Sequence, residues 1–311
     1  MRRLFTIAAT FAALLSSARG EAFCRSSACP ARADGSTDGH VCQPSQGDDC
    51  GIELQWRQPC VGFNIQKDAS SHVDYATAEA TLTAAFAAWL AVDCGGAAPS
   101  IQVFDLGAVD CGRIEYNQHA GNANTLIFRD HTWPHTSANG IGSADTLALT
   151  TVTYDVEKGD IYDADIEVNS VPPNTFTTSD TPGMSDIDLL SVLTHEVGHF
   201  LGLAHSINPA TMYPDYTKGT ISIRTLQPDD LGAICAAYPA GRHAVGECTG
   251  LPRHGYAPGC VEQQTYVRCG VGAAAPGAPG APGAPGAPAL AMIAALMTAR
   301  RATSRRGSRR S

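Results

Sequence analysis

The sequence is poor in three features, and each shortage excludes a class of protein. Its 11 cysteines include no Cys-x-x-Cys pair, so neither a zinc ribbon nor a thioredoxin-like redox site is expected. No apolar run reaches the length of about 18 residues that predicts a membrane-spanning helix. Nine of the 21 Lys and Arg residues lie at or before Arg19 or at or after Arg300, which leaves 12 between them against 30 acidic residues. This excess of acidic residues between the two ends of the chain repels phosphate backbones, so no nucleic-acid partner is expected.

Residues 1–20 have the order of a secretory signal peptide. Arg2 and Arg3 precede the apolar run Leu4–Leu15, and small residues follow. We therefore expect a secreted, extracellular protein whose cysteines form disulfide bonds. Because 11 is an odd number, at least one cysteine is left free, modified or paired with another chain.

The chain after residue 269 has low complexity. Residues 270–288 repeat a Gly-Ala-Pro triplet and predict a disordered, solvated linker. Residues 289–311 hold a short apolar segment and then an Arg-rich tail. That order resembles the sorting tails of some bacterial secreted proteins, which implies association with a membrane or with sorting machinery and retention at the cell surface. A disordered end without such a role is the alternative.

Between these ends, the sequence divides into three parts. Residues 21–53 hold four cysteines but almost no apolar periodicity, so they form a Cys-rich lead-in that cannot build its own core. Residues 54–240 contain the periodic apolar patterns of a folded domain. Residues 241–269 form a loop-like extension in which the cysteines are the only anchors.

The folded part alternates strand and helix patterns. Apolar spacings of three and four predict helices over 75–91, 186–201 and 227–238. Strand-type runs between turn residues predict strands over 61–65, 100–104, 125–128, 147–154 and 161–168. This order predicts an α+β fold. In the last of these strands, Asp163, Asp165 and Glu167 alternate with apolar residues, which predicts one solvent-exposed face and one buried face.

The most informative motif is His195-Glu-Val-Gly-His-Phe-Leu-Gly-Leu-Ala-His205. His195 and His199 lie four residues apart in a helix pattern, so both imidazoles project from one face and can bind one metal ion. Gly202 can take the positive φ that ends the helix and turns the chain, which brings His205 round as a third ligand. Three neutral nitrogens leave one position open on a zinc ion, the arrangement of a catalytic site.

Glu196 lies beside this ligand set without belonging to it. Zinc lowers the pKa of a bound water, and Glu196 can take the proton of that water and pass it to a leaving amine. A purely structural zinc site needs the histidines but no such carboxylate. The motif therefore favours a catalytic zinc ion, with Glu196 as general base and then general acid.

The HExxHxxGxxH pattern, followed by Met212, resembles the metzincin metallopeptidases, whose Met turn lies beneath the zinc ligands. Ser206, directly after the third histidine, makes the matrixin branch the most similar. The resemblance covers residues 54–239. It implies a twisted mixed sheet with an active-site helix and a C-terminal helix, zinc in the cleft, and hydrolysis of protein or peptide substrates as in EC 3.4.24 enzymes. It also implies that Asp229-Asp230 hold the Met turn.

The resemblance raises candidates for further metal sites. Matrixins carry a second, structural zinc on an upstream cluster, for which His131 and His135 are the candidates here, with surface histidines as the simpler interpretation. Calcium at Asp160, Asp163 or Asp165 is the alternative to a solvated strand face.

Latency is another property that the resemblance raises. Matrixins often have an inhibitory cysteine in an Arg-Cys-Gly-Val context before the catalytic domain, whereas Arg268-Cys-Gly-Val271 lies after it in this chain. We hypothesise that the Cys269 thiolate caps the zinc until the tail is cleaved. A disulfide partner or a coincidental match is the simpler interpretation.

The sequence thus predicts a secreted zinc endopeptidase whose substrate is an extended peptide laid along a sheet edge. One alternative is a non-catalytic, disulfide-stabilised surface module with a structural zinc, and another is a small-molecule zinc hydrolase. Glu196, the open zinc position and the Met turn together favour the peptidase.

Overall fold

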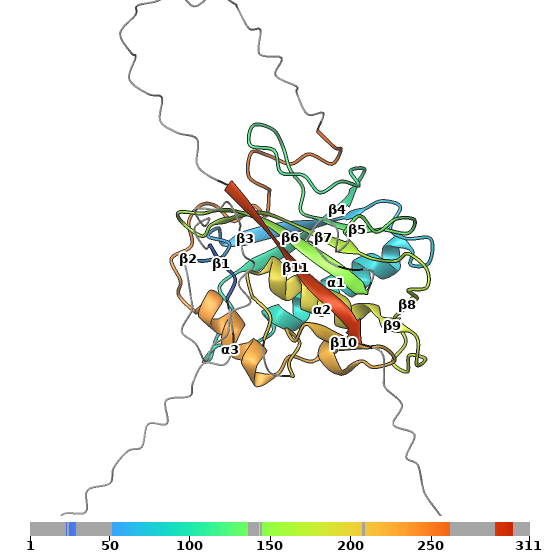
Figure 1. The fold of residues 1–311 in the computed structure, drawn as a ribbon. Helices are drawn as coiled ribbons and strands as arrows, with labels where there is room; N and C mark the ends of the chain where they lie inside the picture. Colours follow the sequence, from blue (N-terminus) through green and yellow to red (C-terminus); the bar gives the residue numbers. More distant parts are fainter. Residues whose placement is uncertain are drawn as a thin grey trace, which may run out of the picture.

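The computed structural model describes residues 23, 25–28, 52–135, 143, 145–206, 209–261 and 290–300. Its centre is a seven-stranded mixed sheet in the order β10-β11-β6-β7-β5-β3-β4 (Figure 1). These strands are β3 (Cys60–Gln66), β4 (Gln102–Val109), β5 (Thr125–Phe128), β6 (Thr146–Asp155), β7 (Ile161–Val168), β10 (Asp215–Thr217) and β11 (Leu290–Arg300). Strands β4, β3, β5 and β7 are mutually parallel, and β6 runs antiparallel to β7. Two short pairs complete the strands: β1 (Ser27–Ala28) with β2 (Ile52–Glu53), and β8 (Phe176–Thr177) with β9 (Ile187–Asp188).

The helices are α1 (Tyr75–Leu90), α2 (Leu189–Phe200) and α3 (Pro228–Ala237), with a 3₁₀ turn, η2, at Ser222–Arg224. Helices α1 and α2 pack against each other on one side of the sheet, while long loops lie on the other side (Figure 1). The predicted α+β fold is therefore observed, and each predicted helix agrees with an observed one to within three residues at either end.

Aromatic rings join the sheet to both helices. Phe63 of β3 stacks on Phe86 of α1 at 4.9 Å between ring centroids, and Phe86 meets Phe200 of α2 edge-on at 5.1 Å. The indole Nε1 of Trp89 donates to the carbonyl oxygen of Thr194 at 2.8 Å. Because Trp89 is completely buried, this bond satisfies a polar atom that has no access to water. These contacts hold α2 against α1, and α1 against the sheet.

The prediction that one face of β7 is exposed to solvent is wrong. All eight residues of the strand are buried, including Asp163 and Asp165, which are 2% and 1% exposed. The cover comes from segments distant in the sequence: Tyr116 stacks on Tyr162 at 6.0 Å, and the guanidinium of Arg253 lies 4.0 Å from the same ring. Alternation of polar and apolar residues shows that the two faces differ, but it does not show what covers each face.

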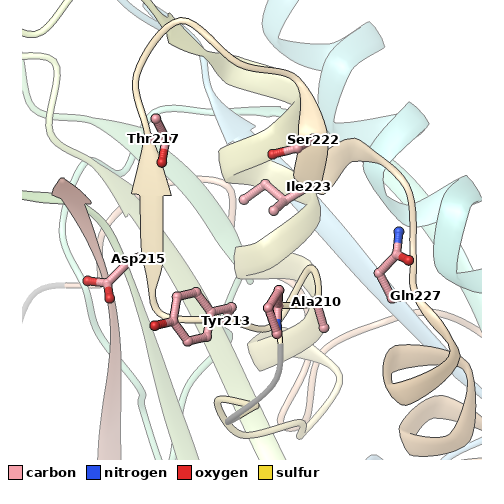
Figure 2. Close-up of a pocket in the computed structure, with 8 residues that line it drawn as sticks. Ala210, Tyr213, Asp215, Thr217, Ser222, Ile223 and Gln227 are labelled. Carbon is pink, nitrogen blue, oxygen red and sulfur yellow. The ribbon is translucent and has the colours of Figure 1, made fainter. Parts of the chain in front are cut away.

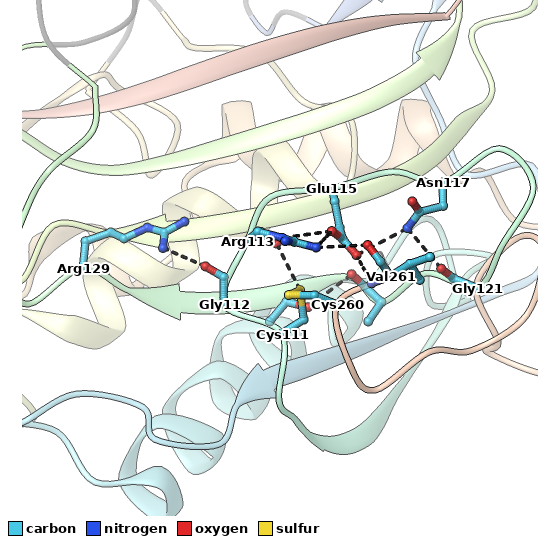
Figure 3. Close-up of a disulfide and its surroundings, with 11 residues drawn as sticks. Cys111, Gly112, Arg113, Glu115, Asn117, Gly121, Arg129, Cys260 and Val261 are labelled. Atoms are coloured by element: carbon cyan, nitrogen blue, oxygen red, sulfur yellow. Dashed lines mark hydrogen bonds and ion pairs between the residues drawn. A yellow bond between two sulfur atoms is a disulfide. The ribbon is translucent and has the colours of Figure 1, made fainter. Parts of the chain in front are cut away.

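Three disulfides confirm the prediction of disulfide bonding: two tie the C-terminal extension to β3 and to the loop after β4, and one ties α3 to the loop after α1. They join Cys60 to Cys248, Cys94 to Cys235 and Cys111 to Cys260. The other five cysteines, Cys24, Cys29, Cys42, Cys50 and Cys269, lie outside the described residues. Figure 3 shows the third bridge, beside which Glu115 accepts hydrogen bonds from Arg113 and from the backbone of Val261. This bridge fixes the cover over the acidic face of β7.

The predicted signal peptide, the linker over 270–288 and the end of the Arg-rich tail lie outside the described residues. Among the helices that the structure describes, none has the length and apolar character needed to cross a membrane. The apolar segment near the C-terminus is not a separate element but strand β11, between β6 and β10. Its pairing partners are more than 70 residues away in the sequence, and the apolar composition alone did not predict them.

Candidate metal centre

Helix α2 brings the first two histidines of the motif together. The Asp188 carboxylate caps the helix by accepting from the Ser191 amide at 2.8 Å, and it also pairs with Arg224 at 2.6 Å. His195 and His199 follow on one face, and their Nε2 atoms are 3.0 Å apart. Both side chains are at least 98% buried. The four-residue spacing thus gives the convergence that the sequence predicts.

The third histidine arrives through a tight turn. Gly202 has a φ of +86°, and a Cβ atom at this position would lie 2.6 Å from the Leu54 carbonyl oxygen, so only glycine fits. After the turn, His205 Nε2 lies 3.1 Å from His199 Nε2. The three ligand nitrogens all fall within 4.8 Å of one another.

The outer nitrogens of two rings are tied to backbone carbonyl oxygens. His195 Nδ1 lies 2.6 Å from the Thr211 oxygen, and His199 Nδ1 lies 2.8 Å from the Leu203 oxygen. A carbonyl only accepts, so each Nδ1 carries the hydrogen and each Nε2 presents a lone pair. Burial lowers the pKa of His195 to about 3 and lowers the pKa of His199 well below its usual value, with the neighbouring His205 adding to both shifts. The lone pairs of unprotonated Nε2 atoms only 3.0 Å apart repel each other unless a cation lies between them. Neutral imidazole nitrogens are ligands that zinc prefers, so this set of donor atoms fits a zinc ion.

Glu196 is completely buried beside this centre. The Thr150 hydroxyl on β6 donates to Glu196 Oε2 at 2.6 Å, while Oε1 has no hydrogen-bond partner among the described residues. Burial raises the pKa of Glu196 to about 8, although the bond from Thr150 opposes the shift. One carboxylate oxygen is therefore held in place, and the other is buried without a partner among the described residues.

The Met turn passes directly beneath α2. Met212 is 2% exposed, and a Cβ atom on Gly198 would overlap its sulfur and approach Trp89 to 2.9 Å. Asp230 at the start of α3 holds the turn, because its carboxylate accepts from the amides of Thr211 at 2.9 Å and Met212 at 3.1 Å. The neighbouring Asp229 accepts from the Ser206 hydroxyl at 2.5 Å. Both aspartates thus hold the segment that follows the third histidine.

A half-open cavity of about 390 Å³ follows the Met turn. Figure 2 shows its lining side chains along the turn, β10 and η2, in front of α2 and with β11 beside Asp215. Tyr213 and Asp215 line it on one side, and Ile223 and Gln227 on the other. Sequence patterns did not identify this cavity, because its walls come from loops without periodicity.

The other predicted metal ligands do not assemble into a second histidine site. His135 Nε2 lies 2.5 Å from Glu167 Oε2, while the other oxygen of Glu167, Oε1, pairs with Arg129. His131 is exposed. Within the described ranges, the only other potential ligand group is Cys111, Glu115 and Cys260, and its two sulfurs are already joined in a disulfide. The candidate second zinc site at His131 and His135 therefore finds no ligand cluster among the described residues.

The acidic candidates differ from one another. Asp160 is paired with Arg57. Asp163 and Asp165 each keep one buried oxygen without a hydrogen-bond partner among the described residues. Burial raises the pKa of both carboxyl groups well above the usual value, and the pKa of Asp163 is raised further by Asp165. Cys269, the candidate latency thiol, lies outside the described residues.

Thr150 and Thr211 were not found by sequence analysis, although they orient Glu196 and His195. Thr150 lies in a strand, where a threonine is equally common as an ordinary residue. Thr211 acts through its backbone carbonyl oxygen, which any residue type would supply. Gly198 was present in the motif, but its packing role depends on Met212 and Trp89, which are distant in the sequence.

Comparison with known proteins places this site in a family context. Residues 116–239 match the matrixin family model. Human neutrophil collagenase is 46% identical over 55 residues, which are 17% of this chain and 12% of that protein. Human matrix metalloproteinase-20 is 40% identical over 70 residues (22% and 14%). The probable matrix metalloproteinase 095L of Invertebrate iridescent virus 3 is 34% identical over 85 residues (27% and 22%). The matched stretches thus span at most 22% of the length of these relatives.

Proposed function

We propose that this chain, a matrixin-like metzincin, is a secreted zinc-dependent endopeptidase that hydrolyses peptide bonds of extracellular proteins. Zinc dependence and endopeptidase activity are the properties of the family that its central residues match. The observation that carries the proposal is the convergence of three imidazole Nε2 atoms, of which two neighbouring pairs are separated by 3.0 Å and 3.1 Å, beside a buried carboxylate.

His195, His199 and His205 would hold the zinc ion through their Nε2 atoms. When bound, zinc supplies a Lewis acid for the scissile carbonyl group and the attacking water. Glu196 takes the proton from that water and delivers it to the leaving amine, because a peptide amine leaves readily only when it is protonated. The Thr150 hydroxyl holds the other oxygen of Glu196 during both transfers.

The test compares the full chain with Glu196→Gln, which keeps the size of the side chain and its contact with Thr150. Zinc content and cleavage of an unfolded protein substrate are measured on both, at high enzyme concentration and with long incubation. We expect one zinc ion per chain in both, and cleavage by the wild type that a chelator abolishes. The variant should lose at least about 10²-fold in rate, the usual share of a general base. A well-folded wild type without zinc would contradict the proposal.

The alternative of a non-catalytic surface module does not account for Glu196. A structural zinc site closes around four ligands. Here a buried carboxylate, one oxygen of which has no hydrogen-bond partner within the described ranges, lies beside three histidines. A small-molecule hydrolase has no feature of its own in its favour, because the family match is to peptidases.

We also propose that Asp163 and Asp165 hold a hard cation such as Ca²⁺. Each has one oxygen without a hydrogen-bond partner among the residues that the structure describes, at a position that is at least 98% buried, and carboxylate oxygens are the ligands that calcium prefers. Calcium should raise the melting temperature of the wild type, and Asp163→Asn should abolish that rise while zinc content stays unchanged. A melting temperature that does not respond to calcium in the wild type would exclude the site.

Secretion and retention at the cell surface belong to the same proposal. They rest on the composition of residues 1–20 and of the C-terminal tail. The measurement is fractionation of the producing cells, with the full chain expected outside the cytoplasm and lacking residues 1–20 at its N-terminus. Recovery of the complete chain from the cytoplasm would contradict secretion.

A further inference from the structure

Strand β11 occupies a specific place in the sheet. It pairs antiparallel with β6, from Leu290 opposite Asp155 to Thr298 opposite Thr146. On its other side it pairs in parallel with β10, with Asp215 opposite Thr298 and Thr217 opposite Arg300. Both edges of the segment are therefore engaged, and β11 is the only partner of β10 among the described strands.

This place lies next to the candidate metal centre. Ala295 lies opposite Thr150, the residue whose hydroxyl donates to Glu196. Strand β10 begins three residues after Met212, so β11 lies between the strand that orients Glu196 and the segment that follows the Met turn. Figure 1 shows β11 crossing in front of α2, and Met297 of β11 is completely buried.

A peptide substrate needs the same position. Extended peptides bind to proteins by adding a strand to an exposed sheet edge, through backbone hydrogen bonds. Here the edge of β6 beside Glu196 already has a strand, and one edge cannot pair with two strands at once. Access of a substrate backbone to Glu196 along β6 therefore requires that β11 leaves.

The composition of the β11 segment also suits a strand that is buried in the middle of a sheet. Residues 290–297 are Leu-Ala-Met-Ile-Ala-Ala-Leu-Met, without charge, Gly or Pro. Such a run loses no ion hydration on burial, and it can form every backbone hydrogen bond of a central strand.

We propose that Leu290–Arg300 is an intramolecular occupant of the substrate-binding edge, which keeps the activity of the full chain low until the segment is displaced. This inference rests on the proposed peptidase function. It differs from the Cys269 hypothesis, because it assigns latency to strand pairing at β6 and not to a thiolate on the metal. It also indicates that the site accepts extended, apolar peptides.

The test uses the full chain with Ala295→Pro. Proline removes a backbone N–H and is poorly tolerated in a central strand, so β11 should leave the sheet. Ala278→Pro, the same change within the Gly-Ala-Pro repeat, is the matched control. Cleavage of an unfolded substrate should rise at least tenfold in Ala295→Pro and stay unchanged in Ala278→Pro. Equal and measurable rates in all three proteins, with equal zinc content, would overturn the inference.

A second measurement separates this inference from the peptidase proposal. A fluorescent peptide with the sequence of residues 290–300 is titrated into chains that carry Glu196→Gln, with and without Ala295→Pro. Binding only in the presence of Ala295→Pro supports occupancy of the edge even if no variant cleaves any substrate. Equal binding to both chains, or binding to neither, would overturn it.

If Ala295→Pro does not fold, a specific protease site placed within residues 270–288 allows β11 to be cut free after folding. The cut chain should then gain activity and bind the labelled peptide. An unchanged rate and no peptide binding after complete cutting and removal of the released segment would overturn the proposal.

Discussion

The sheet separates two buried polar clusters that differ in how far their atoms are satisfied. On the α2 side, His195 and His199 have their Nδ1 atoms tied to carbonyl oxygens, so their Nε2 lone pairs have one defined direction. On the opposite side, Asp163 and Asp165 are equally buried, but each keeps one oxygen without a hydrogen-bond partner in the described part of the chain. Side chains whose orientation is fixed by hydrogen bonds present their free atoms to one ligand position. Buried carboxylates with unsatisfied oxygens must instead be neutralised by a proton or a cation.

The strongest test of this difference removes one histidine. His199→Ala leaves two of the three nitrogens, and we expect loss of the zinc ion and of all measurable cleavage. His131→Ala, at an exposed position, is the control and should keep both. Metal analysis and a cleavage assay measure the outcome. Full zinc content in His199→Ala would show that the two clusters do not differ as described.

A methyl group at Gly198 tests how closely the α2 side is packed. The added Cβ of Gly198→Ala meets Met212 and Trp89, so we expect destabilisation by about 3 kcal/mol, the upper end for overpacked cores. Gly112→Ala, with its nearest atom at 3.8 Å, is the control. The free energy of unfolding in denaturant gives the answer. Equal stability of the two variants would mean that α2 can shift.

Loss of one acceptor at the Met turn should have a smaller effect. In Asp230→Asn, an amide NH₂ group replaces one of the two oxygens that accept from backbone amides at 2.7–3.1 Å. We expect a cost of about 2 kcal/mol from the unsatisfied buried amides. Asp229→Asn, which keeps an oxygen for its bond from Ser206, should cost less. A reversed order in thermal unfolding would contradict this account.

The smallest effect concerns Asp130. Unlike Asp163 and Asp165, this residue accepts hydrogen bonds with both carboxylate oxygens. Burial would raise its pKa, but hydrogen bonds from Ser170, Ser70 and Ser71 outweigh it and lower the pKa to about 2. Its contribution to stability is therefore present above pH 4 and is lost as the pH falls towards 2. Asp130→Asn should cost about 1 kcal/mol at pH 7 and clearly less at pH 2. Urea unfolding at both pH values measures the difference, and a cost that does not change with pH would contradict the assignment.

The sequence predicted the α2 side better than the acidic side because its signals are local. The spacing of His195, His199 and His205 fixes their faces within one helix and one turn. The fate of Asp163 and Asp165 depends instead on a cover that contains Tyr116 and the 250–261 segment. That cover is brought to the sheet through the disulfide between Cys111 and Cys260, whose sequence separation is 149 residues. No pattern in the neighbouring residues reports such a contact.

The position of β11 was unpredictable for the same reason. Its composition predicted only a short apolar segment, and apolar strands and apolar anchors look alike over 11 residues. Only the pairing with β6 and β10 distinguishes them. The helices could therefore be predicted from apolar periodicity, and the convergence of the three histidines from the spacing of their motif. The cavity and the pairing of β11 could not be predicted from either.

If Leu290–Arg300 occupies the substrate-binding edge as proposed, its covalent connection to Val261 sets how the site can open. A competitor held on the same chain by a short tether faces its site at an effective concentration on the order of millimolar, whatever the concentration of the protein. One cut in that connection turns the tethered competitor into a free peptide, which escapes by dilution once the protein leaves a crowded surface. Opening would then depend on where the molecule is released, and the same cut would count for little where the chains stay concentrated.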